Sequence, residues 1–430
     1  MKSSLALLSP AILAAASFGA EAQNRIDLIR PDAPERAALG DYPVGVRTVQ
    51  FTDPGRIDIL STPAEGEIPT VDRSLTVEIW YPAADGTAPG GRYTALLRDG
   101  ETEVTLTGRA ARDAAPALGE FPLVILSHGY PGNRFLMSHL GENLASKGFV
   151  VAAADHPDST YDDQGPFPST LYNRPLDQAF LLDAMAGLDD EVGAITDTDR
   201  TGIVGYSMGG YGALIFGGGG LSQTAVTRTE PAFFAAPQGL LSRHAAGSET
   251  LAALADDGVR AIVAIGPWGR NREFWDAEGL AGVEKPLFLV AGSVDDVSDY
   301  PAMRQIFEET TGVTRYLLTF EGANHNAAAP IPAPAEAWEG EGQSPFDHYA
   351  DAVWDTVRMN NVLQHFATVF FELHLQGFSA AADYLDVVER AEDGVWDLGE
   401  EGEPTAAHSY WLGFPNRTAV GLRLEQRVAE

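Results

Sequence analysis

A serine flanked by glycines occurs in the segment Gly205-Tyr206-Ser207-Met208-Gly209. The apolar run Thr201–Val204 precedes it, and a stretch that reads as a helix begins at Met208. A G-x-S-x-G sequence between a strand and a helix is typical of a sharp turn that exposes the serine hydroxyl. The glycines leave room for the close backbone approach that such a turn requires. We therefore predict that Ser207 is a nucleophile that attacks a carbonyl carbon.

A serine hydroxyl is a weak nucleophile at neutral pH, so Ser207 needs a general base. The best candidate is His325 in the segment Gly322–Asn326, just after a predicted strand at Arg315–Phe320. A loop at the carboxyl end of such a strand lies at the edge where open sheets bind their ligands. The other histidines precede Ser207 or lie in the insertion and the C-terminal region defined below. His325 is therefore the predicted base.

The base in turn needs a carboxylate that orients its ring, and the expected order along the chain is serine, acid, histidine. Asp295 and Asp296 both follow the predicted strand Leu287–Ala291 and its turn. We prefer Asp295, because a position three residues after Gly292 suits the usual loop, and Asp296 is the alternative. Asp299 is a third, weaker candidate.

Attack by a serine leaves a negative oxygen that two backbone N–H donors can stabilise. One donor is expected from Met208, the residue after the nucleophile. The other is expected from the loop Ser127–Gly132, which follows the apolar run Leu123–Leu126. Within this loop we choose Tyr130, whose ring would also form a wall of the site.

An aromatic residue follows a further buried-strand pattern, because Trp268 comes soon after the run Arg260–Ile265. This position predicts a substrate-binding side chain at the same sheet edge, where Trp268 would contact an acyl or alcohol group by apolar and stacking contacts. A tryptophan packed in the core or on the surface is the alternative interpretation.

Regular alternation of strands and helices must position these candidates. Continuous apolar runs at 123–126 and 149–154 are typical of strands buried on both faces of a parallel sheet. Later strands are expected at the runs named above, and helices at His139–Lys147, Leu176–Leu188 and Met303–Thr311. This order predicts an α/β protein with a doubly wound, mostly parallel sheet and helices on both faces.

Three regions lie outside the alternation. Arg47–Phe51 and Leu75–Tyr81, the second with alternating apolar and polar residues, predict an N-terminal antiparallel strand region. Residues 216–258 are too long for one crossover and predict a helical insertion that could cover the site as a lid. Residues 344–430 are a predicted C-terminal helical extension with one long helix at Tyr349–Leu375. We expect residues 23–430 to form a single domain.

The first 22 residues have the features of a signal peptide. Lys2 supplies a positive start, Leu5–Ala16 is a short apolar run, and Ala20-Glu21-Ala22 matches an A-x-A cleavage site. The run is too short to span a bilayer comfortably, and no later segment has 18 uninterrupted apolar residues, so we expect no stable membrane insertion. The sequence therefore predicts export, to the periplasm or the medium.

Composition excludes several other classes of protein. The chain has 430 residues with 28 Lys and Arg against 61 Asp and Glu, a formal net charge of −33, which argues against binding to nucleic acid. The absence of cysteine excludes disulfide scaffolds and thiolate metal sites. No glycine-rich phosphate motif occurs, and Asp155–Asp158 is a poor ligand set. We expect no cofactor and no metal.

Four segments resemble those of the α/β-hydrolase superfamily: Ser127–Tyr130, Leu144–Ala154, Gly205–Gly210 and Gly322–His325. The likeness is greatest to dienelactone-hydrolase-like and platelet-activating-factor-acetylhydrolase-like serine esterases. Pro267-Trp268, together with the Ser207 motif, is similar to the cutinase-like polyester hydrolases. The resemblance implies an α/β-hydrolase fold and ester hydrolysis, with oxyanion donors at Tyr130 and Met208.

We accordingly expect an exported serine hydrolase that cleaves carboxylic esters through Ser207, His325 and Asp295 and an acyl-enzyme. The expected substrate is a small-molecule ester or an ester in a lipid or polymer. Two alternatives remain open: a catalytically silent binding protein on the same fold, and a serine peptidase, which would differ only in the leaving group.

Overall fold

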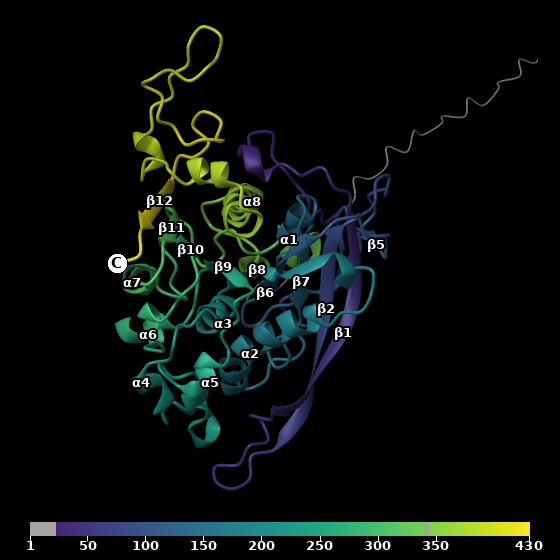
Figure 1. The fold of residues 1–430 in the computed structure, drawn as a ribbon, viewed down its shortest axis with the longest axis vertical. Coiled ribbons are helices and arrows are strands. Elements are labelled where there is room, and N and C mark those ends of the chain that lie inside the picture. The colour runs from purple at the N-terminus through teal and green to yellow at the C-terminus, as the bar shows by residue number, and fades with distance from the viewer. Residues whose placement is uncertain (1–22, 340–344) are drawn as a thin grey trace, which may run out of the picture.

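The computed structural model describes residues 23–339 and 345–430, and a ten-stranded sheet forms its centre (Figure 1). The strand order is β12-β11-β10-β9-β8-β6-β7-β2-β1-β5, and β3 and β4 pair separately. The strands are β1 (Val44–Ile57), β2 (Thr70–Pro82), β3 (Arg92–Leu96), β4 (Glu103–Thr107), β5 (Ala111–Arg112), β6 (Phe121–Ser127), β7 (Val150–Ala154), β8 (Thr196–Tyr206), β9 (Val259–Ile265), β10 (Leu287–Gly292), β11 (Arg315–Phe320) and β12 (Leu422–Arg427). From β11 to β7 all neighbours are parallel, whereas β12 and β2 are antiparallel to theirs.

Helices cover both faces of this sheet, as Figure 1 shows. Alternate residues of the central strands point to opposite faces, so that Val124 packs in the core under α1 and α8, and Leu123 in the core under α2 and α3. Both faces of the strands are apolar, which explains why their sequences are continuous apolar runs. The α-helices are α1 (Ser138–Ala145), α2 (Phe167–Ala186), α3 (Met208–Phe216), α4 (Gln223–Val226), α5 (Glu249–Ala252), α6 (Ala277–Ala281), α7 (Tyr300–Glu309) and α8 (Thr356–Phe371).

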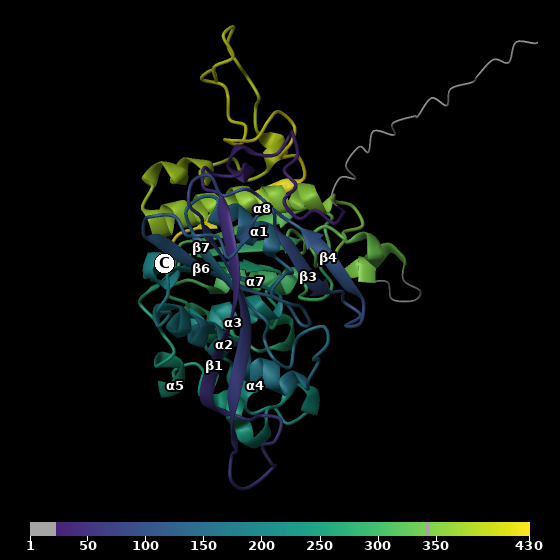
Figure 2. The ribbon, with the colours of Figure 1, turned by 90° about the vertical axis from the view of Figure 1, so that its right-hand side faces the viewer.

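The predicted N-terminal antiparallel region is a long hairpin of β1 and β2, which extends beyond the rest of the sheet (Figures 1 and 2). Its inner end joins the sheet through pairing of β2 with β7. The alternation of apolar and polar residues in Leu75–Tyr81 is typical of a strand with one face exposed to solvent, but Glu78 on the polar side is fully buried. Arg112 donates to Glu78 Oε1, so the buried carboxylate is paired, as such groups must be.

The insertion at 216–258 contains α4, α5 and two short 3₁₀ segments, Ala232–Phe234 and Pro237–His244. Residues of the second segment pack against α2, where His244 Nε2 lies 2.8 Å from the Tyr172 carbonyl oxygen. The insertion is therefore attached to the helical layer beside α2 and α3. Its opening as a lid stays a prediction.

The C-terminal region is less helical than the sequence predicted. The long helix begins at Thr356, where the Asp355 side chain accepts from the Arg358 N–H, and ends at Phe371 before a π-helical turn over Glu372–Gln376. The chain then returns to the sheet as β12, an unpredicted strand that pairs with the edge strand β11. Covering that edge removes a row of unpaired backbone groups. The description of residues 344–430 as a helical extension is therefore only partly right.

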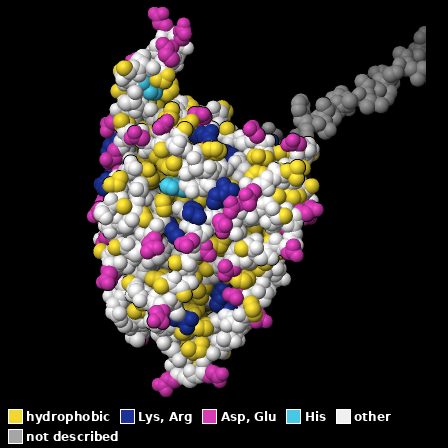
Figure 3. Space-filling view, in the orientation of Figure 1, with side chains coloured by type: hydrophobic (Ala, Val, Ile, Leu, Met, Phe, Trp, Pro, Cys, Tyr) yellow, Lys and Arg dark blue, Asp and Glu magenta, His cyan; other side chains and the backbone are white. Residues whose placement is uncertain are grey.

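Acidic side chains are spread over the face shown in Figure 3, with basic side chains among them, and do not form one patch. Many arginines are paired with carboxylates, for example Arg304 with Glu425 and Arg270 with Glu309. Among the described residues, no helix is both long enough and apolar enough to cross a bilayer. The predicted signal peptide, residues 1–22, lies outside the described residues.

Candidate active site

Ser207 occupies a strained turn between β8 and α3. Its φ of 52° and ψ of −109° are unusual for a residue with a side chain, and strain of this kind is concentrated at functional sites. A Cβ at Gly205 would lie 2.3 Å from the Gly209 carbonyl oxygen, and a Cβ at Gly209 would lie 2.0 Å from the Ser127 carbonyl oxygen. Both glycines are needed because neighbouring backbone occupies the space of a side chain.

His325 and Asp295 meet Ser207 at the carboxyl edge of the sheet. His325 Nε2 lies 2.9 Å from Ser207 Oγ, and His325 Nδ1 lies 2.7 Å from Asp295 Oδ2. These residues follow β11, β10 and β8, which lie within four adjacent positions of the sheet order. The geometry allows Ser207 O–H to donate to Nε2 while Nδ1–H donates to the carboxylate, the arrangement in which a histidine base activates a serine hydroxyl.

The three aspartates considered from the sequence have different surroundings. Asp295 is buried, and its Oδ1 accepts from the backbone N–H groups of Val297 and Ser298 at 2.8 and 2.9 Å. Asp296 is exposed at the rim of the site, and Asp299 caps α7 through the Ala302 N–H. The structure thus brings Asp295 to His325, and neither of the alternatives makes that contact.

Tyr130 and Met208 flank the serine on neighbouring elements, because β6 and β8 pair directly. Met208 is the first residue of α3, where backbone N–H groups have no partner within the helix. Within the described residues, no recorded hydrogen bond uses the N–H of Tyr130 or of Met208. The Tyr130 ring packs edge-on against Phe167 and its hydroxyl donates to the Gly165 carbonyl at 2.8 Å, so the residue is well anchored. The placement of both residues fits their predicted role as oxyanion donors.

The backbone of Trp268 lies beside that of Ser207, because the Trp268 N–H donates to the Ser207 carbonyl at 3.2 Å. Its side chain is 8% exposed and packs with Phe167, Phe234 and Phe274 in an aromatic cluster. Trp268 does not line the cavity described next. Its contact with substrate stays a prediction.

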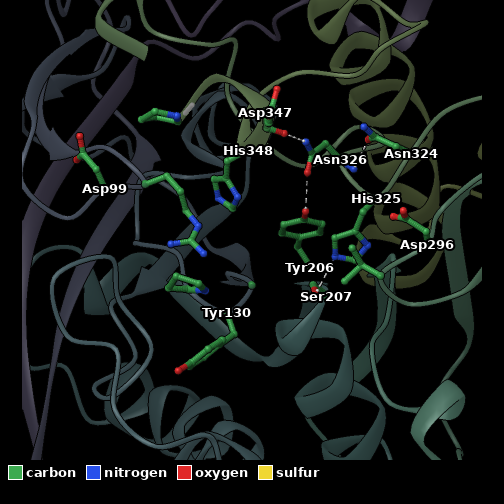
Figure 4. A pocket seen from close by; sticks show the side chains of 15 residues that line it. Asp99, Tyr130, Tyr206, Ser207, Asp296, Asn324, His325, Asn326, Asp347 and His348 are labelled. Carbon is green, nitrogen blue, oxygen red and sulfur yellow. Dashed lines mark hydrogen bonds between the residues drawn. The ribbon is translucent and has the colours of Figure 1, made fainter. Parts of the chain in front are cut away.

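A cavity of about 430 Å³ opens on Ser207 and His325 (Figure 4). This volume falls in the usual range for small-molecule sites. The Tyr206 hydroxyl donates to Asn326 Oδ1 at 3.1 Å, and Asn326 Nδ2 donates to the carbonyls of Asp347 and Ala350. The lining residues are Arg98, Asp99, Gly129, Tyr130, Pro131, Tyr206, Ser207, Asp296, Val297, Asn324, His325, Asn326, Pro345, Asp347 and His348.

Sequence reasoning assigned no role to Arg98 or His348, two of the residues that line the cavity. Each comes from a region outside the strand–helix alternation, and neither belongs to a recognisable motif. Only the folded chain brings them to the nucleophile. His348 Nε2 lies 2.8 Å from the Tyr161 hydroxyl, and burial lowers the pKa of His348 to about 3, so its ring is neutral at pH 7.

A second hydrogen-bonded series of serine, histidine and aspartate is buried beneath the loop Ser127–Gly132, here called the Tyr130 loop. Ser127 Oγ lies 2.9 Å from His156 Nε2, and His156 Nδ1 lies 3.1 Å from Asp177 Oδ2. Arg73 and Arg56 also pair with Asp177, and their charges hold the pKa of Asp177 below its usual range despite burial. None of these three side chains lines the cavity, so their role is structural.

The Asp155–Asp158 segment, weighed as a metal site, is occupied by protein partners. Asp155 pairs with Arg134, and Asp158 accepts from Arg73 at 3.0 Å. Within 23–339 and 345–430, no group of three or more His, Asp or Glu side chains has an arrangement that could hold a metal ion.

Comparisons with known proteins point to esterases. Residues 93–162 match the family described as platelet-activating factor acetylhydrolase, isoform II. Cutinase est1 of Thermobifida alba is 36% identical over 91 residues, 21% of this chain and 28% of that protein. Cutinase 2 of Thermobifida cellulosilytica is 24% identical over 206 residues, 47% of this chain and 60% of that protein. A ferulic acid esterase structure from Streptomyces cinnamoneus has a TM-score of 0.58 and 22% identity, covering 83% of this chain and 94% of that one.

These likenesses have different extents. The chain spans 28% and 60% of the length of the two cutinases, whereas the structural likeness covers most of both chains. The α/β-hydrolase fold predicted from the sequence is confirmed. The predicted resemblance to esterases is also confirmed, and the matched family segment includes the loop Ser127–Gly132.

Proposed function

We propose that this α/β-hydrolase-fold protein is an exported serine esterase that cleaves carboxylic esters through an acyl-enzyme on Ser207. The observation that carries the proposal is the hydrogen-bonded series Ser207, His325 and Asp295 at the mouth of a cavity. The similarity to cutinases and to a ferulic acid esterase supports an ester rather than an amide as the bond that is cleaved.

The geometry suggests a role for each group. His325 Nε2 takes the Ser207 proton as Ser207 Oγ attacks the ester carbonyl, and Asp295 keeps the imidazole in the required tautomer and stabilises its positive charge. The N–H groups of Tyr130 and Met208 stabilise the negative oxygen. His325 then protonates the leaving alcohol, and water hydrolyses the acyl-enzyme by the same proton path in reverse.

The substrate class follows from the size of the site and from the relatives. A cavity of about 430 Å³ accepts a small ester or the end of a longer chain, such as a lipid or polyester. Export rests on the positive start at Lys2, the apolar run Leu5–Ala16 and the A-x-A site ending at Ala22. Intact mass of the protein recovered outside the cytoplasm tests it: the mature chain should begin at Gln23, and a chain that keeps Met1 or stays inside the cell contradicts export.

Labelling with a fluorophosphonate probe, combined with hydrolysis of nitrophenyl esters, tests the esterase proposal. The wild type should be labelled and active, and Ser207→Ala should lose labelling and at least about 10⁴-fold in kcat/KM. Ser74→Ala, at an exposed position on β2, is the matched control and should behave as wild type. An unlabelled wild type favours the silent binding protein, and equal rates on matched esters and amides favour a peptidase.

A further inference from the structure

One cation lines the cavity beside the nucleophile. Arg98 lies just after β3, is half-buried, and shares the cavity with Ser207 and His325. Across the part of the chain that the structure describes, its guanidinium has no recorded hydrogen bond or ion pair. Other partly buried arginines near the site are paired, as Arg134 is with Asp155. A partly buried guanidinium without a partner is costly, and a bound anion would offset that cost.

Three side chains close enough to respond to the charge of Arg98 are themselves uncharged at neutral pH. Burial, helped by the charge of Arg98, lowers the pKa of His348 to about 3. Burial raises the pKa of Tyr161 well above its usual value and also raises that of Tyr130, against the opposing effect of Arg98. The Tyr161 hydroxyl lies 2.8 Å from Nε2 of the neutral His348 ring. None of these groups neutralises the guanidinium.

Three carboxylates also line the cavity, but all three are exposed to solvent. The Asp99 carboxylate stabilises its own turn, because it accepts hydrogen bonds from the Glu101 and Thr102 N–H groups at 3.0 and 2.9 Å. Figure 4 shows Asp296 on the opposite side of the cavity from Asp99 and Tyr130. The half-buried positive charge thus remains available to a ligand.

We propose that Arg98 binds an anionic group carried by the ester, so that the cavity selects esters bearing a carboxylate or a phosphate. The guanidinium offers a planar fork of N–H donors that matches two oxygens of either anion. Because His348 responds to the charges of both Arg98 and His325, the anion site and the reacting centre share one small space. The inference rests on the proposed esterase function and names its substrate class.

The direct test compares two esters of equal chain length, one ending in a methyl group and one in a carboxylate: 4-nitrophenyl hexanoate and the 4-nitrophenyl monoester of adipic acid. Arg98→Gln should lower kcat/KM for the adipyl ester about 10- to 100-fold, mainly through KM, and change that for the hexanoate less than about twofold. Arg98→Lys should retain part of the preference. Arg92→Gln, an exposed position on β3 outside the cavity, is the control and should leave both values unchanged.

A binding measurement separates this inference from the esterase proposal. Calorimetric titration of Ser207→Ala protein needs no turnover, and succinate, glycerol phosphate and neutral butyramide serve as probes. The two anions should bind more tightly than the amide, and Arg98→Gln should remove the difference. The anion that binds more tightly shows whether the site prefers a carboxylate or a phosphate group on the ester. Equal binding of all three probes, or an unchanged ester ratio in Arg98→Gln, overturns the role of Arg98 even if Ser207 proves catalytic.

Discussion

His156 Nε2 lies 2.9 Å from Ser127 Oγ, the same distance that joins His325 Nε2 to Ser207 Oγ. The two pairs differ in how far they are buried. Ser127 and His156 are no more than 1% exposed and line no part of the cavity, whereas Ser207 and His325 face it. A nucleophile needs a path for substrate, so the buried pair can only support structure. What it supports is the Tyr130 loop, because Ser127 begins that loop.

The buried histidines His128 and His156 should position the loop Ser127–Gly132, which carries Tyr130. His156 donates its backbone N–H to His128 Nε2, His128 Nδ1 lies 2.7 Å from the Gly129 carbonyl oxygen, and Arg174 donates to the His128 carbonyl. We expect His156→Phe to lower kcat about 10- to 100-fold with little change in KM, because the Tyr130 donor moves. Steady-state kinetics on a neutral nitrophenyl ester measures the effect.

His244→Phe is the control for that variant, since His244 is equally buried but contacts α2 rather than the loop. It should lose stability without a selective loss of kcat. If both variants lose kcat to the same extent, the contacts of His156 have no special role in positioning Tyr130.

Asp295 should be far more important for turnover than its neighbour. Asp295→Asn keeps the size of the side chain but favours the wrong His325 tautomer, so we expect kcat to fall by about 10³- to 10⁴-fold. Asp296→Asn, at the exposed rim, should remain within about twofold of wild type for a neutral ester. The kcat values at pH 8 decide the matter. A larger loss in Asp296→Asn would transfer the role of acid to that residue.

The glycines of the Ser207 turn should tolerate no side chain. Gly209→Ala places a Cβ 2.0 Å from the Ser127 carbonyl oxygen, which is too close, so the backbone must move. We expect a loss of several kcal/mol in the free energy of unfolding, and loss of activity, as for other overpacked sites. Gly187→Ala is the matched control, because its nearest neighbour is 3.5 Å away and its φ of −89° is ordinary. Chemical denaturation of both variants gives the comparison, and equal stabilities would show that the turn relaxes easily.

Acid should destabilise the protein through His139 of α1. Both ring nitrogens of His139 are buried without a hydrogen-bond partner in the described structure, and burial lowers its pKa from 6.5 to about 3. The unfolded chain therefore binds a proton between pH 6.5 and 3 that the folded protein excludes, and stability falls as the pH falls through this window. At pH 5 this one group costs on the order of 2 kcal/mol relative to pH 8.

His139→Leu removes that cost. The free energy of unfolding from urea titrations at pH 8 and pH 5 should fall less in His139→Leu than in wild type. His408→Leu, which changes a half-buried histidine near the C-terminus, serves as the control and should keep the wild-type slope. Parallel losses in wild type and His139→Leu would mean that His139 is protonated or solvated in the folded state.

Local patterns were sufficient for the framework of the fold. The runs 123–126 and 149–154 and the alternation from residue 121 to residue 320 identify the parallel strands, because strands buried on both faces must be continuously apolar. The G-x-S-x-G segment identifies the strand-to-helix turn because its backbone geometry needs glycine at fixed positions. The edge strand β12 was harder to predict from the sequence, since it is short and half-exposed and its place depends on pairing with the distant β11.

The amino-acid sequence by itself determined the α/β framework and the candidates Ser207, Asp295 and His325, because strand burial, tight turns and chain order leave local signals. Only the tertiary structure decided which of two adjacent aspartates contacts His325, since the turn buries Asp295 against the ring and leaves Asp296 exposed. It alone brought Arg98 and His348 to the nucleophile, and it alone buried Glu78. Such contacts join residues far apart in the chain, and packing, rather than any local preference, sets them.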